Sequence, residues 1–117
     1  MTEVRHAGGA IARVEPGTNA YGHRDAELVL NLIGMTPTPE AYQHLVAYST
    51  EFKRLLGPSM TGGVYMNFLE GEESRRRIRD AYSPETYQRL AALKAKYDPH
   101  NLFNYSFNIQ SLDDGSA

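Results

Sequence analysis

Tyrosine is the residue type through which this sequence could most readily do chemistry. The chain has eight tyrosines and neither cysteine nor tryptophan. Tyr65 follows the pair Gly62-Gly63 and stands two residues before Asn67, so a hydroxyl and a carboxamide point the same way if the segment is extended. Glycine beside polar strand residues indicates that something flat approaches the backbone closely. Periodicity alone nevertheless favours a packing role for Tyr65.

Other common catalytic and binding patterns are missing from the sequence. Without cysteine there is no disulfide, thiolate nucleophile or cysteine-ligated metal. The serines stand in no nucleophile-elbow context, and neither double glycine continues as a phosphate-binding loop does. No metal site is predicted, because the histidines are scattered without metal-ligand spacing; they are His6, His23, His44 and His100.

Composition and charge exclude further classes of protein. The 117 residues carry a formal net charge of -2, which excludes a broadly basic nucleic-acid binder. The basic run Arg75-Arg76-Arg77 is preceded by Glu72 and Glu73, and pairs four residues apart predict a solvated helix face. No apolar run is long enough for a membrane span, and the first residues do not resemble a secretory signal. We expect a cytoplasmic protein without membrane or nucleic-acid partners.

Alternating and glycine-punctuated segments predict the strands. We expect one strand over residues 4–14, bent at Gly8-Gly9, and a second over residues 26–35, where apolar side chains fill both alternating faces. A third strand is expected over residues 62–69, with Tyr65 and Asn67 on one face.

Capping residues and apolar stripes predict three helices. Thr38 followed by Pro39 is typical of a helix start, and Gly57-Pro58 is typical of a helix end. Ser83 caps a later helix in the same way. The expected helices cover residues 39–56, 72–82 and 84–97.

This order of elements predicts an α+β fold. We expect a mostly antiparallel sheet of three or more strands with helices packed on one face. Residues 1–109 form a single domain in this interpretation, and residues 110–117 are a polar C-terminal tail.

An ordered set of motifs resembles a known family. The motifs are Gly62-Gly63-Val64-Tyr65-Met66-Asn67-Phe68, Ala81-Tyr82, Lys94-x-Lys96-Tyr97-Asp98-Pro99-x-Asn101-Leu102-Phe103 and Asn108-Ile109. Together they resemble the C-terminal berberine-bridge-enzyme-like segment of FAD-linked oxidases with the vanillyl-alcohol-oxidase-type fold. Upstream, residues 8–14 and 20–24 are similar to substrate-domain strands of bacterial members.

The resemblance implies a flavin enzyme. Members oxidise an alcohol, a sugar or an amine-bearing carbon by hydride transfer to FAD, and the cofactor carries the redox chemistry. By position, Tyr65 matches a residue on the substrate side, which makes it the candidate catalytic hydrogen-bond donor or base. Asn67 and Asn108 match cofactor-binding positions. Many members have a second tyrosine where this chain has Phe68, so the base role would fall to Tyr65 or lie elsewhere.

The resemblance also implies a partner. The part of these enzymes that binds FAD is not found in the sequence, so we expect the FAD-binding domain on a companion chain or a longer polypeptide, with a small-molecule substrate. On that interpretation the chain alone is inactive. Two alternatives stay open: a non-enzymatic homodimeric interaction or ligand-binding module, and a cofactor-free dimeric α+β barrel enzyme.

Overall fold

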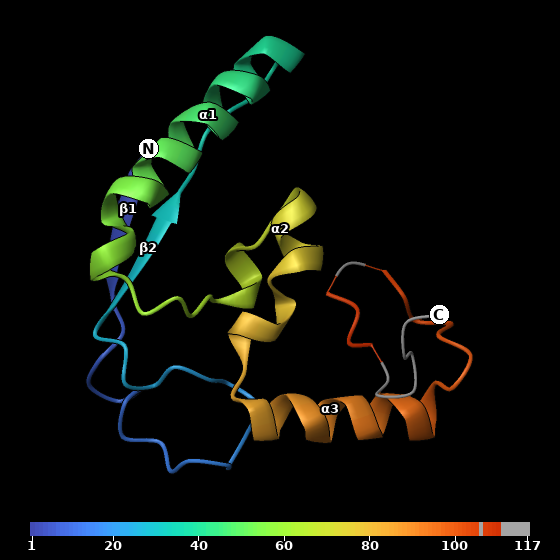
Figure 1. Cartoon of the computed structure of the whole chain (residues 1–117). Coiled ribbons are helices and arrows are strands. Elements are labelled where there is room, and N and C mark those ends of the chain that lie inside the picture. Colours follow the sequence, from blue (N-terminus) through green and yellow to red (C-terminus); the bar gives the residue numbers. More distant parts are fainter. Residues whose placement is uncertain (106, 111–117) are drawn as a thin grey trace.

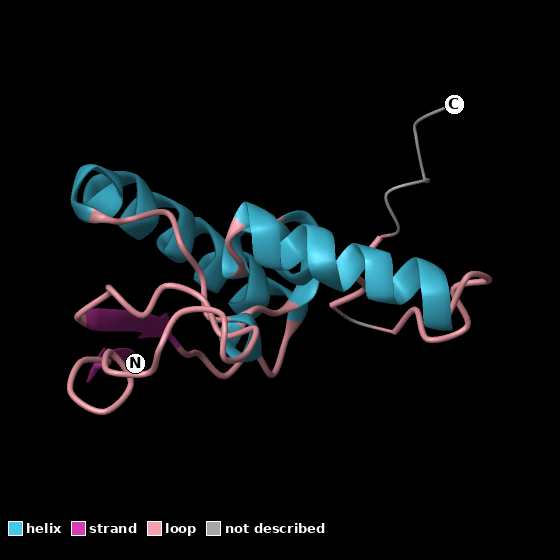
Figure 2. Cartoon of the chain, turned by 90° about the horizontal axis from the view of Figure 1, so that it is seen from below, coloured by secondary structure: helices cyan, strands magenta, loops and turns pink. Residues whose placement is uncertain are grey.

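The computed structural model describes residues 1–105 and 107–110 and has an α+β architecture (Figure 1). The chain runs from a two-stranded sheet through a long helix to a cluster of short helices and a last helix. The strands are β1 (Thr2–His6) and β2 (Leu28–Leu32), and the helices are α1 (Pro39–Leu56), α2 (Gly71–Arg76) and α3 (Pro84–Tyr97). In both views α3 extends away from the sheet (Figure 2).

The first two predicted strands form the sheet but are shorter than expected. β1 and β2 pair antiparallel, from Thr2 opposite Leu32 to His6 opposite Leu28. The prediction of a strand over residues 4–14 is wrong beyond His6, because Gly9 takes a positive φ of 64° and turns follow it. The strand expected over residues 26–35 is confirmed only for its centre.

The predicted third strand over residues 62–69 is wrong, and so is the expectation of three or more strands for the described residues. Gly62 has a φ of 84°, and Met66–Phe68 form a 3-10 turn. The backbone N–H of Phe68 donates to Tyr65 O at 2.9 Å. The N–H of Val64 donates at 3.2 Å to Asp80 O, which lies in a 3-10 turn rather than in a strand. The segment therefore forms hydrogen bonds within itself and with the turn at residues 78–81, and it pairs with no strand of the sheet.

The first predicted helix is confirmed at both ends. The Thr38 hydroxyl accepts a hydrogen bond from the N–H of Ala41 at 3.2 Å, and Pro39 occupies the first turn of α1. The helix ends at Leu56, before Gly57-Pro58. None of its residues is buried, so the packing of helices on one face of the sheet stays a prediction.

The second predicted helix is split into two pieces. α2 ends at Arg76, and residues 78–81 form a 3-10 turn after the kink at Arg77, whose φ and ψ are -112° and 10°. The predicted ion pairs are present, since Arg76 lies 3.1 Å from Glu72 and Arg77 lies 4.0 Å from Glu73. The pair of Arg76 with Glu72 is exposed, as the sequence indicated, whereas Arg77 and Glu73 are half-buried.

The small core lies where these pieces meet α3. Its buried residues belong to the α2 region and to α3; they are Leu69, Ser74, Ile78, Ala81, Tyr87 and Ala91, with Ala7 buried separately near the sheet. Many large apolar side chains of the described residues are left uncovered, among them Met35 at 94% exposed and Leu102 at 77%.

We predict that the cap of α3 is an important local stabiliser. The Ser83 hydroxyl accepts from the N–H of Thr86 at 3.2 Å, so Ser83→Ala should lower the free energy of unfolding by about 1 kcal/mol. Chemical denaturation followed by circular dichroism measures this change. Ser83→Asp, which keeps an acceptor at the cap, should stay near the original stability; an equal loss in both variants would contradict the role of the cap.

Candidate functional site

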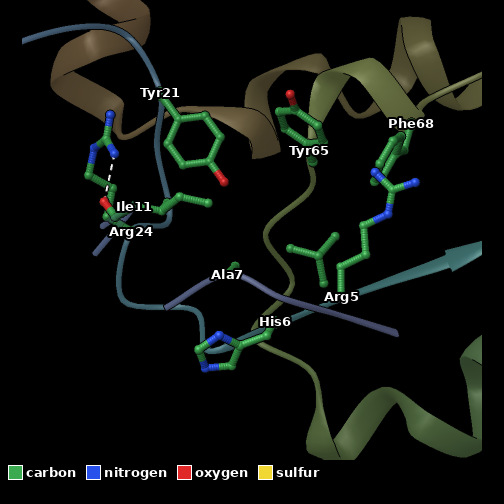
Figure 3. A pocket seen from close by; sticks show the side chains of 9 residues that line it. Arg5, His6, Ala7, Ile11, Tyr21, Arg24, Tyr65 and Phe68 are labelled. Atoms are coloured by element: carbon green, nitrogen blue, oxygen red, sulfur yellow. Dashed lines mark hydrogen bonds between the residues drawn. The ribbon is translucent and has the colours of Figure 1, made fainter. Parts of the chain in front are cut away.

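Three aromatic rings meet at an open pocket beside the sheet (Figure 3). The ring of Tyr65 lies edge-on between two others, with its centroid 5.7 Å from Tyr21 and 4.9 Å from Phe68. The interplanar angles of 65° and 87° are those of favourable edge-to-face contacts. We define the aromatic pocket by Tyr21, Tyr65, Phe68, Arg5 and Arg24; its volume is about 460 Å³.

Asn67 and Tyr65 lie close together on a 3-10 turn, not on one face of a strand as the sequence predicted. The Nδ2 of Asn67 donates a hydrogen bond to the Tyr65 hydroxyl oxygen at 2.7 Å. Tyr65 is half-buried and Asn67 is exposed. The hydroxyl proton of Tyr65 has no hydrogen-bond acceptor among the described residues, so it is available to a ligand.

Two arginines lie over the outer rings of the pocket. The Arg5 guanidinium lies 4.9 Å from the centroid of Phe68, and that of Arg24 lies 4.8 Å from the centroid of Tyr21. Arg5 also pairs with Glu3 at 2.9 Å, and this hydrogen bond lowers the pKa of the Glu3 carboxyl below its ordinary value. Sequence reasoning missed both arginines as site residues; the spacing Tyr21-x-x-Arg24 was the available signal.

The loop that carries Tyr65 is fixed by His23. The Nε2 of His23 is hydrogen-bonded to the carbonyl of Asp80, which also accepts from the N–H of Val64. The imidazole lies so close to Gly63 that a Cβ there would be 2.6 Å from its Nδ1. Glycine is required at residue 63 by this close approach.

Arg77 fixes the same loop from the other side. Its Nη2 donates to the carbonyl of Gly62 at 2.8 Å, and its Nε pairs with Asp80 at 2.9 Å. The His23 ring therefore packs against Gly63, and Arg77 is hydrogen-bonded to Gly62. Together these two contacts fix the backbone just before Tyr65.

A larger groove continues from Tyr65 between the sheet and the end of α1. Its volume is about 630 Å³, and its apolar walls include Leu30 of β2 and Leu56 of α1. Tyr82 also lines it and donates a hydrogen bond to Met66 Sδ at 3.1 Å. Burial raises the pKa of Tyr82 above its ordinary value, so Tyr82 stays protonated at neutral pH. Tyr65 thus borders open space on both sides.

Asn108, the third predicted site residue, is not brought to the aromatic pocket. It lines neither cavity, and its segment, residues 107–110, lies beside α3 on the far side from the sheet (Figure 1). Its Oδ1 is buried and has no hydrogen-bond partner among the described residues. Ser106 lies outside the described residues, as does the predicted tail over residues 110–117 except for Gln110.

The most specific stretch of the sequence resemblance forms a clasp at the end of α3. We call Lys94, Asp98, Leu102 and Phe103 the clasp. The Asp98 carboxylate accepts from the N–H groups of Leu102 at 2.7 Å and Phe103 at 3.0 Å, and it pairs with Lys94. Lys94 also donates to Phe103 O at 2.7 Å. These residues therefore shape the backbone after α3 rather than line the aromatic pocket.

Clusters of metal ligands and membrane-spanning helices are absent from the described part of the chain. Among residues 1–105 and 107–110, no three His, Asp or Glu side chains gather as metal ligands would. No helix in the same residues is long and apolar enough to cross a membrane. A cytoplasmic location stays a prediction.

Comparison with known proteins identifies the C-terminal part. The family model described as "Berberine and berberine like" matches residues 64–110. (R)-6-hydroxynicotine oxidase of Paenarthrobacter nicotinovorans is 37% identical over 90 residues, which are 74% of this chain and 19% of that protein. An FAD-linked oxidoreductase of Metarhizium anisopliae is 32% identical over 107 residues, 88% of this chain and 20% of that protein.

A third relative has a different named substrate. Chitooligosaccharide oxidase of Gibberella zeae is 29% identical over 112 residues, 88% of this chain and 21% of that protein. The chain spans about a fifth of the length of the curated relatives that it matches.

We predict that Gly63→Ala disturbs the loop before Tyr65. The new methyl group would overlap the His23 ring, and such overpacking should lower the free energy of unfolding by about 1–3 kcal/mol. Gly57→Ala is the matched control, because a Cβ there meets nothing within 4 Å. Chemical denaturation compares the two; a Gly63→Ala variant as stable as the control would refute the contact.

We also predict a pH-dependent clasp. The hydrogen bond from Lys94 lowers the pKa of Asp98 below its ordinary value of 3.8, and the backbone N–H groups of Phe103 and Leu102 act in the same direction. The clasp therefore contributes stability above that ordinary value and loses it as pH falls through the lower folded-state pKa. Amide hydrogen exchange at Leu102 and Phe103, corrected for intrinsic rates, should accelerate in that acid range. In Asp98→Asn it should be fast at neutral pH; protection unchanged by both acid and mutation would disprove the clasp.

Proposed function

Because residues 64–110 are a berberine-bridge-enzyme-like segment, we propose that this chain is part of an FAD-dependent oxidoreductase. In this proposal it supplies one wall of the substrate site, and Tyr65 is the residue nearest the substrate. The observation that carries the proposal is the Tyr65–Asn67 hydrogen bond, which lies inside the matched segment where Tyr65 borders both the aromatic pocket and the larger groove.

The residues around Tyr65 fit one face of a flat heteroaromatic ring. The groove offers apolar walls, and the Tyr65 hydroxyl and the Asn67 carboxamide provide polar groups at its edge. A dinucleotide cofactor needs more contact than one such wall provides, which supports a separate FAD-binding domain. FAD, when bound, accepts the hydride that leaves the substrate carbon.

The chain's own residues would then handle the proton. Asn67 occupies one lone pair of the Tyr65 oxygen and fixes the hydroxyl's direction. The remaining lone pair can accept a hydrogen bond from the substrate's O–H or N–H. That proton can pass to the Tyr65 oxygen while the Tyr65 hydroxyl proton passes to solvent, as general base catalysis requires. Phe68, which has no hydroxyl, packs against Tyr65 and limits its movement. The Oδ1 of Asn108, buried without a partner among the described residues, is proposed as a contact to the cofactor-binding part.

The uncovered apolar surface supports a companion domain or chain. Large side chains on the sheet and α1 are more than half exposed, among them Val4 at 59%, Leu28 at 61% and Leu55 at 62%. Exposed patches of this kind are typical of interaction surfaces. The same surface would serve the alternative of a homodimeric interaction module, which analytical ultracentrifugation distinguishes by a concentration-dependent dimer of this chain alone.

The other alternative, a cofactor-free α+β barrel, requires a closed sheet around a pocket. Within the described residues the sheet has two strands and does not close. We therefore favour the flavin-dependent function.

A chimera tests the proposed function. In it, the stretch of (R)-6-hydroxynicotine oxidase that matches this chain is replaced by this chain. We expect the chimera to retain FAD, seen by visible absorption, and to oxidise a compound from a panel of alcohols, sugars and amines. Tyr65→Phe should slow anaerobic flavin reduction by about 100-fold or more, the usual effect of losing a general acid or base.

The matched control is Tyr42→Phe, which removes a hydroxyl from the exposed side of α1, where Tyr42 is 52% exposed. Its flavin reduction should match the unmodified chimera. A chimera without flavin, or Tyr65→Phe reducing flavin as fast as Tyr42→Phe, would overturn the proposal.

A further inference from the structure

The aromatic pocket is positively charged, although the chain as a whole has a net charge of -2. Two guanidinium groups, those of Arg5 and Arg24, line it, and none of the residues lining it is an aspartate or glutamate. The remaining lining side chains are aromatic or aliphatic (Figure 3). A cationic ligand would be repelled here, and an anion would be attracted.

Arg5 has hydrogen-bonding capacity left for a ligand. Glu3 engages only its Nε, at 2.9 Å, and Glu3 does not line the pocket. The two terminal nitrogens of Arg5 have no acceptor among the described residues. Their planar pair of donors matches the two oxygens of a carboxylate. The face of Phe68 beneath the guanidinium holds the side chain in place.

Arg24 contributes charge from a fixed position at the other end of the pocket. It donates to Ile11 O at 2.8 Å and to Asn19 Oδ1 at 2.8 Å, so it cannot turn away. Figure 3 shows Arg24 beyond Tyr21 and Arg5 beside Phe68, with Tyr65 between them. A ligand in the pocket therefore lies between two positive groups.

The rings determine the shape of ligand that fits. Tyr65 stands edge-to-face with both Tyr21 and Phe68, so a further flat ring can pack against the exposed faces and edges of this group. A volume of about 460 Å³ accommodates a small ring system.

We propose that the aromatic pocket selects a planar aromatic carboxylate, with the carboxylate on Arg5 and the ring against Tyr65 and Phe68. This inference rests on the proposed function, because it names the class of substrate presented to Tyr65. A neutral analogue would leave the Arg5 donors without a charged partner.

Ligand-observed fluorine NMR tests the selection with a matched pair, 4-fluorobenzoate and 4-fluorobenzamide, added to the full chain without flavin. The two probes differ in charge but hardly in shape. We expect the benzoate to bind about tenfold more tightly, the effect of one hydrogen bond to a charged group. Arg5→Gln should abolish the difference, and Arg5→Lys should retain part of it.

The control is Arg75→Gln, which removes the same charge from an exposed position of α2 and should leave the preference unchanged. Equal affinity of the unmodified chain for both probes would overturn the inference, and this comparison needs no variant to fold. A preference that survives Arg5→Gln in a chain with an unchanged circular dichroism spectrum would also overturn it. So would displacement of the benzoate by an equal concentration of FMN, since the pocket would then belong to the cofactor.

These outcomes are separate from the test of the proposed function. The probes are measured without flavin, so a chimera that binds no FAD would remove the oxidoreductase proposal and leave anion selection intact. If the chimera is active but the chain binds both probes equally, the oxidoreductase proposal stands and the selection of an aromatic carboxylate is refuted.

Discussion

The carbonyl oxygen of Asp80 is the junction on which the arrangement of the molecule depends. It accepts hydrogen bonds from His23, which comes from the N-terminal part, and from the N–H of Val64, which begins the loop of Tyr65. Gly22 packs so tightly beside it that a Cβ there would lie 2.8 Å from Ala81 O. Because the core is small, these few contacts hold the N-terminal part of the chain against the turn at residues 78–81. Since Val64 is bonded to the same carbonyl, the junction also positions the loop that carries Tyr65.

A shortage of buried apolar surface is the second feature of the fold, and it agrees with the proposed role. A two-stranded sheet is marginally stable by itself, and α1 contributes no buried residue. Hydrophobic burial is the dominant favourable term in folding, so a chain that leaves Val4, Leu28 and Leu55 exposed gains stability when another surface covers them. In the proposed function, a companion domain would cover both the open groove beside Tyr65 and these exposed side chains.

The residues that carry the family resemblance divide into two groups with different physical roles. Tyr65 lies at the aromatic pocket, and its hydrogen-bond partner Asn67 lies at the larger groove. Lys94, Asp98, Leu102 and Phe103 form the clasp, which fixes the backbone after α3. The sequence alone could not separate these roles. An aspartate that accepts hydrogen bonds from the backbone and an aspartate that binds a ligand are the same residue type. The distances to Leu102 and Phe103 separate them.

Local chemistry let the sequence determine the helix caps at Thr38 and Ser83 and the end of α1 before Gly57-Pro58. Each depends on residues close together in the chain. The sequence located the two strands of the sheet only in part, because their pairing joins residues far apart in the chain. Only the tertiary structure decided that residues 62–69 are not a strand, that Arg5 and Arg24 join Tyr65, and that Asn108 lies elsewhere. The reason is that a strand needs hydrogen bonds to a neighbouring strand, and a pocket needs side chains from distant parts of the chain. Neither requirement is encoded in neighbouring residues.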